Sequence, residues 1–152
     1  MERPEPNAVD NSPLPWPWRI LQHRRLLVIL GTALVFGLSS IPFRTASPLW
    51  RMDKWFHILE YLLVGLAYLN FITQGFAQLN RGKVMAFLFL LITLAASDEW
   101  HQRFVPGRSS NVGDFLASTF GGILALAVAV WLNRKLRKIP EIHTGDNLTS
   151  KN

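Results

Sequence analysis

The sequence contains no cysteine, which excludes disulfide bonds, thiolate metal sites and cysteine nucleophiles. It also has no P-loop, no nucleophilic-serine elbow and no His-x-x-x-His pair in its 152 residues. The net charge of +6 is accompanied by no recognition helix and no aromatic–basic platform, so nucleic-acid binding is not predicted. These absences leave no predicted catalytic residue, no predicted metal site and no predicted cofactor.

Hydrophobic residues, 49% of the chain, are concentrated between positions 26 and 132. They form four runs, at residues 26–43, 55–76, 84–96 and 112–132. A helix needs about 20 residues to cross a membrane. Because the third run is apolar for only 13 residues, its helix is expected to continue to about Arg103. The sequence therefore predicts an all-α, multi-pass membrane protein with four transmembrane helices.

The two ends of the chain are polar. Residues 1–25 carry five prolines and predict a flexible arm, and residues 133–152 predict a basic, disordered tail. The first apolar run could instead be the core of a signal peptide, with Gly37 and Ser39 resembling a cleavage site. An uncleaved anchor is favoured, because the 25-residue leader is long and three further spans follow.

Basic residues are distributed unequally between the two sides that four crossings create. Eleven of the 16 Lys and Arg residues fall in the arm, the second loop and the tail, and five fall in the first and third loops. The positive-inside rule then places both termini in the cytoplasm. The ionisable residues near the opposite helix ends would form one outward-facing polar layer, and we expect it to contain Asp53, Lys54, His57, Glu60, Asp98, Glu99, His101, Gln102, Arg103, Arg108 and Asp114.

Spacing within this layer allows both structural and binding roles. Lys54, His57 and Tyr61 share one helix face, and Glu60 is close enough to pair with His57. Asp98 shares a face with Gln102. The carboxylates and histidines could hold a divalent ion or supply a general base, but the spacings match no familiar ligand pair or catalytic motif.

Glu99 and Arg108 lie in the polar stretch between residues 97 and 114, and each could likewise have a structural or a binding role. Glu99 is expected to point inward and to be among the least replaceable residues, because its loss would leave any buried cationic partner uncompensated. Arg108 lies beside the first turn of the last helix, where Ser110 or Asn111 can act as the N-cap. Exposed backbone N–H groups beside an arginine could bind an anion. Alternatively, Arg108 could pair with a carboxylate of Glu99 or Asp114 and hold the loop in place.

Small residues recur every four positions on the last helix, at Ala117, Gly121 and Ala125, with Ser118 and Gly122 alongside. Such a face allows close approach of a neighbouring membrane helix. We therefore interpret it as a packing surface.

Three linked motifs resemble the VanZ-like family of small bacterial membrane proteins. They read Asp53-Lys54-x-x-His57-x-x-x-Tyr61, then Asp98-Glu99-x-x-Gln102, then Pro106-Gly107-Arg108-Ser109, with Asp114 and Gly121 following. The resemblance covers residues 41–126 and implies a multi-pass protein of the bacterial plasma membrane. The family commonly has Asn four residues after the final Asp, where this sequence has Ser118. The family's namesake is associated with resistance to the glycopeptide teicoplanin.

Three functions are compatible with these features. The first is binding of an anionic lipid or cell-wall precursor at the polar layer. The second is an intramembrane enzyme acting on a lipid phosphoester or acyl group. The third is a non-catalytic accessory subunit of an envelope or polysaccharide assembly system, in which the polar layer is structural. We favour the first, and its expected binding residues are Lys54, His57, Tyr61, Asp98, Glu99, Gln102, Arg108, Ser109 and Asp114.

Overall fold

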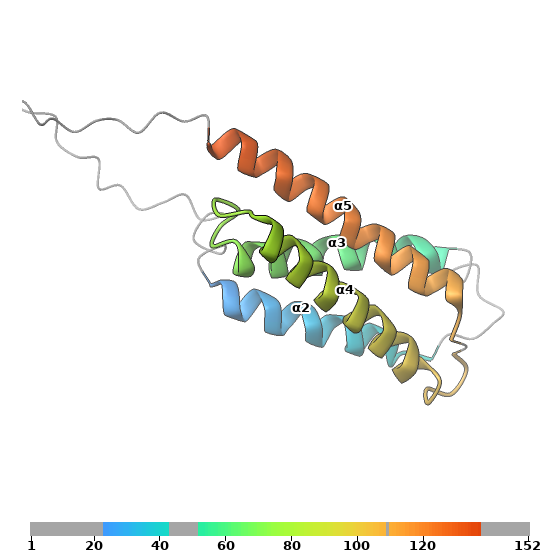
Figure 1. Cartoon of the computed structure of the whole chain (residues 1–152). Helices are drawn as coiled ribbons and strands as arrows, with labels where there is room; N and C mark the ends of the chain where they lie inside the picture. Colours follow the sequence, from blue (N-terminus) through green and yellow to red (C-terminus); the bar gives the residue numbers. More distant parts are fainter. Residues whose placement is uncertain (1–22, 43–51, 109, 138–152) are drawn as a thin grey trace, which may run out of the picture.

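The computed structural model describes residues 23–42, 52–108 and 110–137, and within these ranges it is all-helical, without a strand. The helices are α2 (Arg24–Ser39), α3 (Asp53–Ile72), α4 (Arg81–Gln102) and α5 (Val112–Leu136). They run alongside one another, and α2 begins at the end of the bundle where α5 finishes (Figure 1). The predicted arm falls mostly on residues 1–22 and the predicted tail mostly on residues 138–152, which lie outside the described residues.

Three helices are long and apolar enough to cross a membrane. They are α3, α4 and α5, with 20, 22 and 25 residues. The prediction that the third helix continues through the polar residues after Ala96 is confirmed, because α4 ends at Gln102. Without this extension, the apolar part of α4 would be too short to cross.

The first apolar run forms a shorter helix than predicted. α2 has 16 residues and ends at Ser39, which corresponds to roughly 24 Å at 1.5 Å per residue. Pro42 explains the early end, since a proline disfavours helical geometry in the residue before it. A fourth crossing is therefore not established by length and composition alone.

The outer surfaces of the helices are apolar. Ile29 on α2, Leu63 on α3 and Phe89 on α4 are each more than half exposed. In the three long helices, 28–33% of the most apolar 18-residue window is buried inside the protein. Exposed surfaces of this kind suit contact with lipid chains.

The small residues of α5 pack against neighbouring helices, as predicted. A Cβ atom at Gly121 would lie 2.3 Å from the carbonyl oxygen of Ile58, and one at Gly122 would lie 2.3 Å from a methyl group of Leu91. The α3 and α5 backbones can approach this closely only because Gly121 has no side chain. This contact fixes the beginning of α3 beside the beginning of α5.

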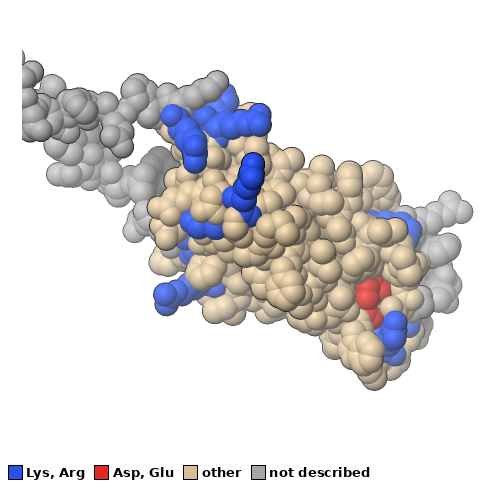
Figure 2. Space-filling model, in the orientation of Figure 1, with Lys and Arg blue, Asp and Glu red and all other residues tan. Residues whose placement is uncertain are grey.

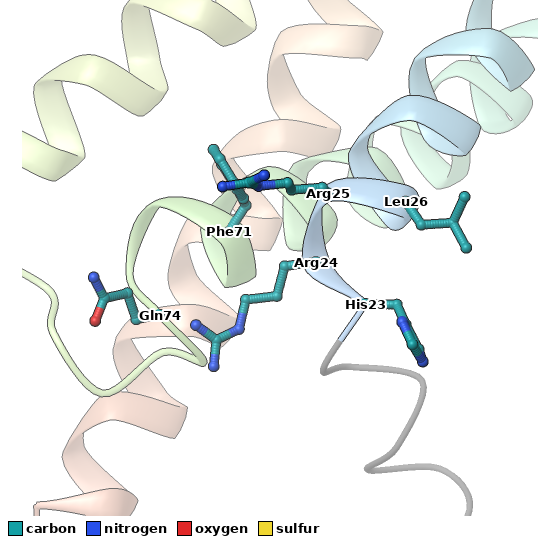
Figure 3. A pocket seen from close by; sticks show the side chains of 6 residues that line it. All are labelled: His23, Arg24, Arg25, Leu26, Phe71 and Gln74. Atoms are coloured by element: carbon teal, nitrogen blue, oxygen red, sulfur yellow. The ribbon is translucent and has the colours of Figure 1, made fainter.

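Most of the described Lys and Arg residues lie at one end of the bundle, whereas the acidic residues lie at the other end together with a few basic side chains (Figure 2). A hollow of about 610 Å³ lies at the basic end, lined by His23, Arg24, Arg25, Leu26, Phe71 and Gln74 (Figure 3). The connection between α3 and α4 lies at the same end. The Asn133 side chain of α5 donates hydrogen bonds to two carbonyl oxygens of this connection, those of Phe76 and Ala77, at 2.6 and 2.8 Å.

Candidate functional site

The polar residues of the other end come from all four described helices. The end of α2 and the end of α4 meet the beginnings of α3 and α5 there. Every acidic residue in the described ranges lies in this region, either in the last turns of α4 or in the first turns of α3 and α5. The sequence prediction that these residues form one layer is consistent with this arrangement.

A hydrogen-bond network centred on Asp98 joins α2 to α4. Ser39 donates its hydroxyl to Asp98 Oδ1, and Gln102 donates to Asp98 Oδ2 at 3.2 Å. Arg108 in turn donates to Gln102 Oε1 at 3.3 Å. Asp98 and Gln102 are each only 1% exposed. Their shared helix face, expected from the spacing of four, therefore points into the protein.

His57 joins this network to α5. Its Nδ1 atom is 3.3 Å from Ser118 Oγ and 4.0 Å from Asp98 Oδ2. The Nε2 atom is buried and has no hydrogen-bond partner within the described residues. The sequence suggested Glu60 as the partner of His57, but the structure pairs His57 with Ser118 and Asp98. Ser118 thus supplies a hydroxyl contact at the position where the resemblance led us to expect an Asn.

Two cationic side chains reach carboxylates at the beginnings of α3 and α5. Lys54 donates to Asp114 Oδ1 at 2.9 Å, although its own side chain is 55% exposed. Arg108 NH1 is 3.9 Å from Asp53 Oδ1. Arg108 does not form the ion pair with Glu99 or Asp114 that the sequence suggested as one alternative.

Arg108 connects the loop to α2. Its Nε donates to the carbonyl oxygen of Ile41 at 3.3 Å and its NH2 to that of Leu38 at 3.2 Å. Its side chain is only 7% exposed. These contacts support the structural alternative, in which Arg108 holds the loop in place. They leave its guanidinium in contact with protein groups on several sides.

Glu99 occupies the beginning of α5. Its Oε2 atom accepts hydrogen bonds from the backbone N–H of Asn111 at 2.9 Å and from the Ser110 hydroxyl at 3.2 Å. Asn111 is the N-cap, and its side chain accepts from the N–H of Gly113. The inward orientation of Glu99 is confirmed, since the residue is 8% exposed. A carboxylate at a helix N-terminus is favoured by the helix dipole, so Glu99 itself fills the anion position predicted beside this helix.

A small cavity opens beside the network. It has a volume of about 120 Å³ and is lined by Leu38, Ser39, Ile41, Asp53, Phe56, His57, Glu60 and Arg108. Glu60 contributes a buried Oε1 atom that has no hydrogen-bond partner among the described residues. One part of the wall is polar and ionisable, and another is aliphatic or aromatic.

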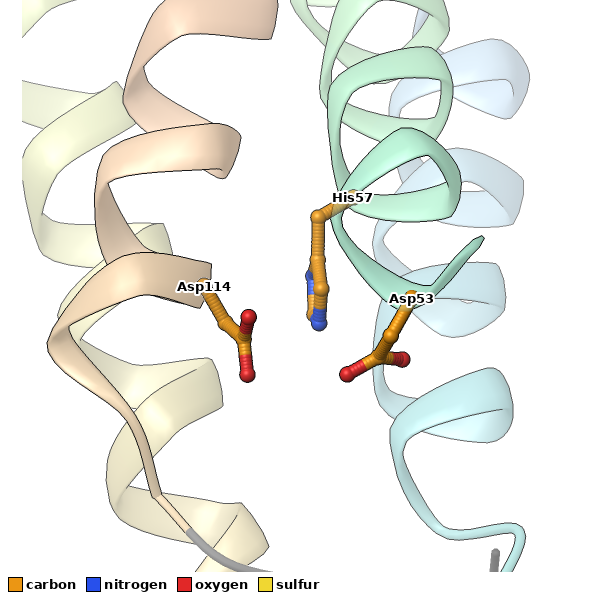
Figure 4. Close-up of side chains that lie close together, drawn as sticks. All are labelled: Asp53, His57 and Asp114. Carbon is orange, nitrogen blue, oxygen red and sulfur yellow. The ribbon is translucent and has the colours of Figure 1, made fainter. Parts of the chain in front are cut away.

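A second arrangement lies on the α5 side of His57. One ligand-type atom from each of Asp53, His57 and Asp114 lies within 4.8 Å of the other two. Figure 4 shows the imidazole ring between the two carboxylates, with one nitrogen at its tip. Oxygen and imidazole nitrogen atoms are ligands that divalent transition metals accept.

Most of the residues expected at the site are brought together. Tyr61 lies in the fully buried core of α3, and Ser109 is outside the described residues. His101 contacts Ser40 at 3.0 Å, and Arg103 lies over the ring of Trp100. The expected binding residues did not include Asp53, Glu60, Ser39 or Ser118. The spacing of four between Asp53 and His57 could have indicated the first of these, because it places both on one helix face.

Comparison with known proteins identifies the family of this chain. A family model described as VanZ/LLP1 matches residues 13–133. No curated protein and no solved structure matches the chain. The matched range contains all four described helices except the last residues of α5, and with them the whole polar cluster. The chain therefore belongs to the VanZ/LLP1 family and is a membrane protein of the VanZ type.

Proposed function

We propose that this protein crosses the bacterial plasma membrane four times, with both termini in the cytoplasm. Its outward-facing polar end binds the headgroup of an anionic lipid or of a lipid-linked cell-wall precursor. The observation that carries this proposal is the cavity between α2, α3 and Arg108, which combines ionisable and apolar walls at one end of a membrane-spanning bundle.

The cavity has the size of one small polar group. At about 30 Å³ per molecule, 120 Å³ corresponds to roughly four waters, which is enough for a phosphate or for part of a sugar. Leu38, Ile41 and Phe56 provide an apolar wall on which a lipid chain can lie. Binding sites for small molecules typically combine a mostly apolar lining with a few polar groups that fix orientation.

The charges around the cavity suit a ligand with both anionic and neutral parts. Lys54 is the more exposed cation, and Arg108 forms part of the cavity wall. Asp53 and Glu60 can accept hydrogen bonds from hydroxyl or ammonium groups, because carboxylate oxygens are strong acceptors. A headgroup that carries a phosphate together with a hydroxylated or amino-bearing portion meets both requirements.

The contacts of α2 support a fourth crossing and argue against a cleaved signal peptide. Ser39 donates to Asp98, and the carbonyl oxygens of Leu38 and Ile41 accept from Arg108. Removing α2 would take the Ser39 hydroxyl from Asp98 and two carbonyl acceptors from Arg108, and the loss of such hydrogen bonds from buried side chains is costly. Sixteen helical residues together with Ser40 and Ile41 could cross a locally thinned bilayer.

The distribution of charge supports the orientation. The described basic end contains Arg81, Lys83 and Arg134 and no acidic residue, whereas all described acidic residues lie at the other end. Positive residues are retained on the cytoplasmic side. The polar cavity would then lie near the outer leaflet, where lipid-linked cell-wall precursors are displayed.

The proposal can be tested by identifying the lipids that remain bound after purification in polymer discs. Ile41→Trp adds bulk to the cavity wall at a residue that is 50% exposed, so the fold should tolerate it. We expect this change to lower retention of a specific anionic lipid about ten-fold, corresponding to roughly 1.4 kcal/mol. Leu59→Trp is the matched control, because Leu59 is 53% exposed on α3 and does not line the cavity. Equal lipid profiles in wild type and Ile41→Trp would contradict the proposal.

Arg108→Lys separates binding from scaffolding. Lysine keeps the charge but loses the planar fork that reaches Leu38, Ile41 and Gln102 together. Thermal stability and lipid retention should be measured on the same sample. Loss of stability with normal lipid retention in the remaining folded protein would assign Arg108 to the scaffold and leave the cavity without a cationic ligand-binding group.

One observation favours a second function, that of an intramembrane enzyme acting on a lipid phosphoester. His57 has a buried nitrogen without a partner in the described ranges, and Asp53 and Asp114 are next to it. An imidazole in this position could act as a general base. Release of phosphate from a lipid phosphoester by the wild type, but not by His57→Gln, would replace the binding function with a catalytic one.

A further inference from the structure

We infer that Asp53, His57 and Asp114 form a binding site for one divalent transition metal ion, such as Mn²⁺ or Zn²⁺. The three side chains belong to the first turns of α3 and α5, which the close contact at Gly121 holds side by side. Metal binding itself does not depend on the proposed function. The role of the ion as a contact for an anionic headgroup rests on the proposed function.

The spacing of the three ligand atoms is close to what an ion requires. They lie within 4.8 Å of one another. Ligand atoms at about 2.0–2.2 Å from a metal can be separated by at most about 4.4 Å, when they lie on opposite sides of it. The 4.8 Å limit exceeds this separation by only about 0.4 Å, a difference that a small side-chain rotation of either aspartate can remove. Two carboxylates and one imidazole form an oxygen-rich donor set that suits Mn²⁺ or Zn²⁺.

His57 provides the second, independent observation. The residue is only 3% exposed, and its Nε2 atom has no hydrogen-bond partner within the described part of the chain. The tip of the ring lies between the carboxylates of Asp53 and Asp114 (Figure 4). A buried nitrogen without a hydrogen bond is costly unless something binds it. A metal ion held by both carboxylates would meet this need.

The surroundings of Nδ1 are those of a metal-binding histidine. Ser118 Oγ is 3.3 Å away and Asp98 Oδ2 is 4.0 Å away. An Nδ1–H directed at these oxygens leaves the lone pair on Nε2, where an ion would bind. Metal-ligating histidines commonly donate their second N–H to a carboxylate or a similar acceptor. Ser118 and Asp98 therefore act as positioning residues for the proposed ligand.

Lys54 competes with the ion for Asp114. Its ammonium group is 2.9 Å from Asp114 Oδ1, so it holds the carboxylate that the ion would need. Because the lysine side chain is 55% exposed, it can move into solvent when the ion binds. Without metal, Lys54 neutralises the charge of Asp114. Removal of Lys54 should therefore favour the metal-bound state.

A divalent ion would also explain how an anion can bind among carboxylates. Asp98, Glu99 and Asp114 are buried, and Arg108 is the cation with the most buried side chain in the described part of this cluster. A bare phosphate entering this region would meet repulsion from these carboxylates. Three protein ligands leave coordination positions open on the ion, and a phosphate oxygen could occupy one of them.

The test uses full-length protein in mild detergent, stripped with a chelator and titrated with Mn²⁺ alone. Unbound Mn²⁺ is measured by its electron paramagnetic resonance signal. We expect one saturable site, weakened at least ten-fold by Asp53→Asn or His57→Gln and about 10- to 100-fold by Ser118→Ala. Lys54→Met should tighten binding. His101→Gln is the matched control, since His101 is a histidine at the same end of the bundle that belongs to neither the trio nor the cavity wall.

A measurement on the wild type guards against variants that fail to fold. Pulsed resonance of the bound Mn²⁺ should show coupling to one imidazole nitrogen, and the coupling should persist in His101→Gln. Absence of a saturable site, or unchanged affinity in His57→Gln, would overturn the metal site. So would loss of the nitrogen coupling in His101→Gln.

The same samples separate this inference from the proposed function. Lipids are identified by mass spectrometry before and after chelation. One bound Mn²⁺ with lipid retention independent of chelation would overturn the ion's role at the headgroup while supporting the metal site. Specific lipid retention without a Mn²⁺ site would overturn the metal site and leave the proposed function standing.

Discussion

The two ends of the helix bundle use charge in opposite ways. At the basic end, Arg25, Arg134 and Lys135 are exposed, and Lys135 lies over the ring of Trp131. At the polar end, Asp98 and Asp114 are buried and bonded to side chains of other helices. Exposed charges can set the orientation of the protein in the membrane without fixing its tertiary structure. Buried charges require a specific set of partners, and such a set is the beginning of a site.

The largest expected effect comes from breaking the buried network. Asp98→Ala removes the acceptor of Ser39 and Gln102 and the carboxylate near His57. We expect a loss of about 3–5 kcal/mol in unfolding free energy, the cost typical of removing one partner of a buried pair. Unfolding in detergent, followed by helical circular dichroism, measures it. Asp98→Asn keeps the shape and should lose less. Equal losses in both variants would contradict the role of the charge.

A smaller loss of unfolding free energy is expected when the hydrogen bonds of Asn133 at the basic end are removed. Asn133→Ala leaves the buried carbonyl oxygen of Phe76 and the more exposed one of Ala77 without their donor. The cost of such unsatisfied groups is about 1–3 kcal/mol, measured by the same unfolding experiment. Asn133→Asp is the control, because it keeps the size but cannot donate when ionised. A stable Asn133→Asp variant would show that the two hydrogen bonds do not hold the turn.

The smallest effects on stability are expected when one basic residue is replaced at each end of the bundle. Lys54→Met removes the partner of the buried carboxylate of Asp114 and should cost about 1 kcal/mol, reduced by the exposure of the lysine. Arg134→Met, at an exposed position of the basic end, should change stability by less than about 0.5 kcal/mol. Melting temperatures of the two variants provide the comparison. A larger loss in Arg134→Met would reverse the contrast between the ends.

Much of the fold could be predicted because membrane segments follow simple rules of length. The apolar runs gave the three long helices, and the need for about 20 residues extended the third helix through Asp98 and Glu99. The small residues of α5 indicated its packing face, because only close backbone approach requires them. The early end of α2 at Ser39 was missed, since hydropathy does not register the effect of Pro42 on the preceding backbone.

The partners within the site could be predicted only in part. Spacing along one helix indicated that Asp98 and Gln102 share a face, and this is confirmed. Spacing gives no information about contacts between helices. The contact of His57 with Ser118 and that of Arg108 with the end of α2 therefore required the three-dimensional structure. The Asp53–His57–Asp114 arrangement combines both kinds of contact, and only its first two members share a helix.

An outward-facing headgroup site requires that the polar end of the bundle faces the outside of the cell. Because the chain has no cysteine, a single introduced thiol can report its own location. Arg103→Cys marks the polar end, and Gly82→Cys marks the basic end, where a Cβ atom has room. On intact spheroplasts, an impermeant thiol reagent should label Arg103→Cys and should label Gly82→Cys and Ser150→Cys only after lysis. Labelling of Gly82→Cys on intact spheroplasts, with Arg103→Cys protected until lysis, would contradict the orientation and with it an outward-facing headgroup site.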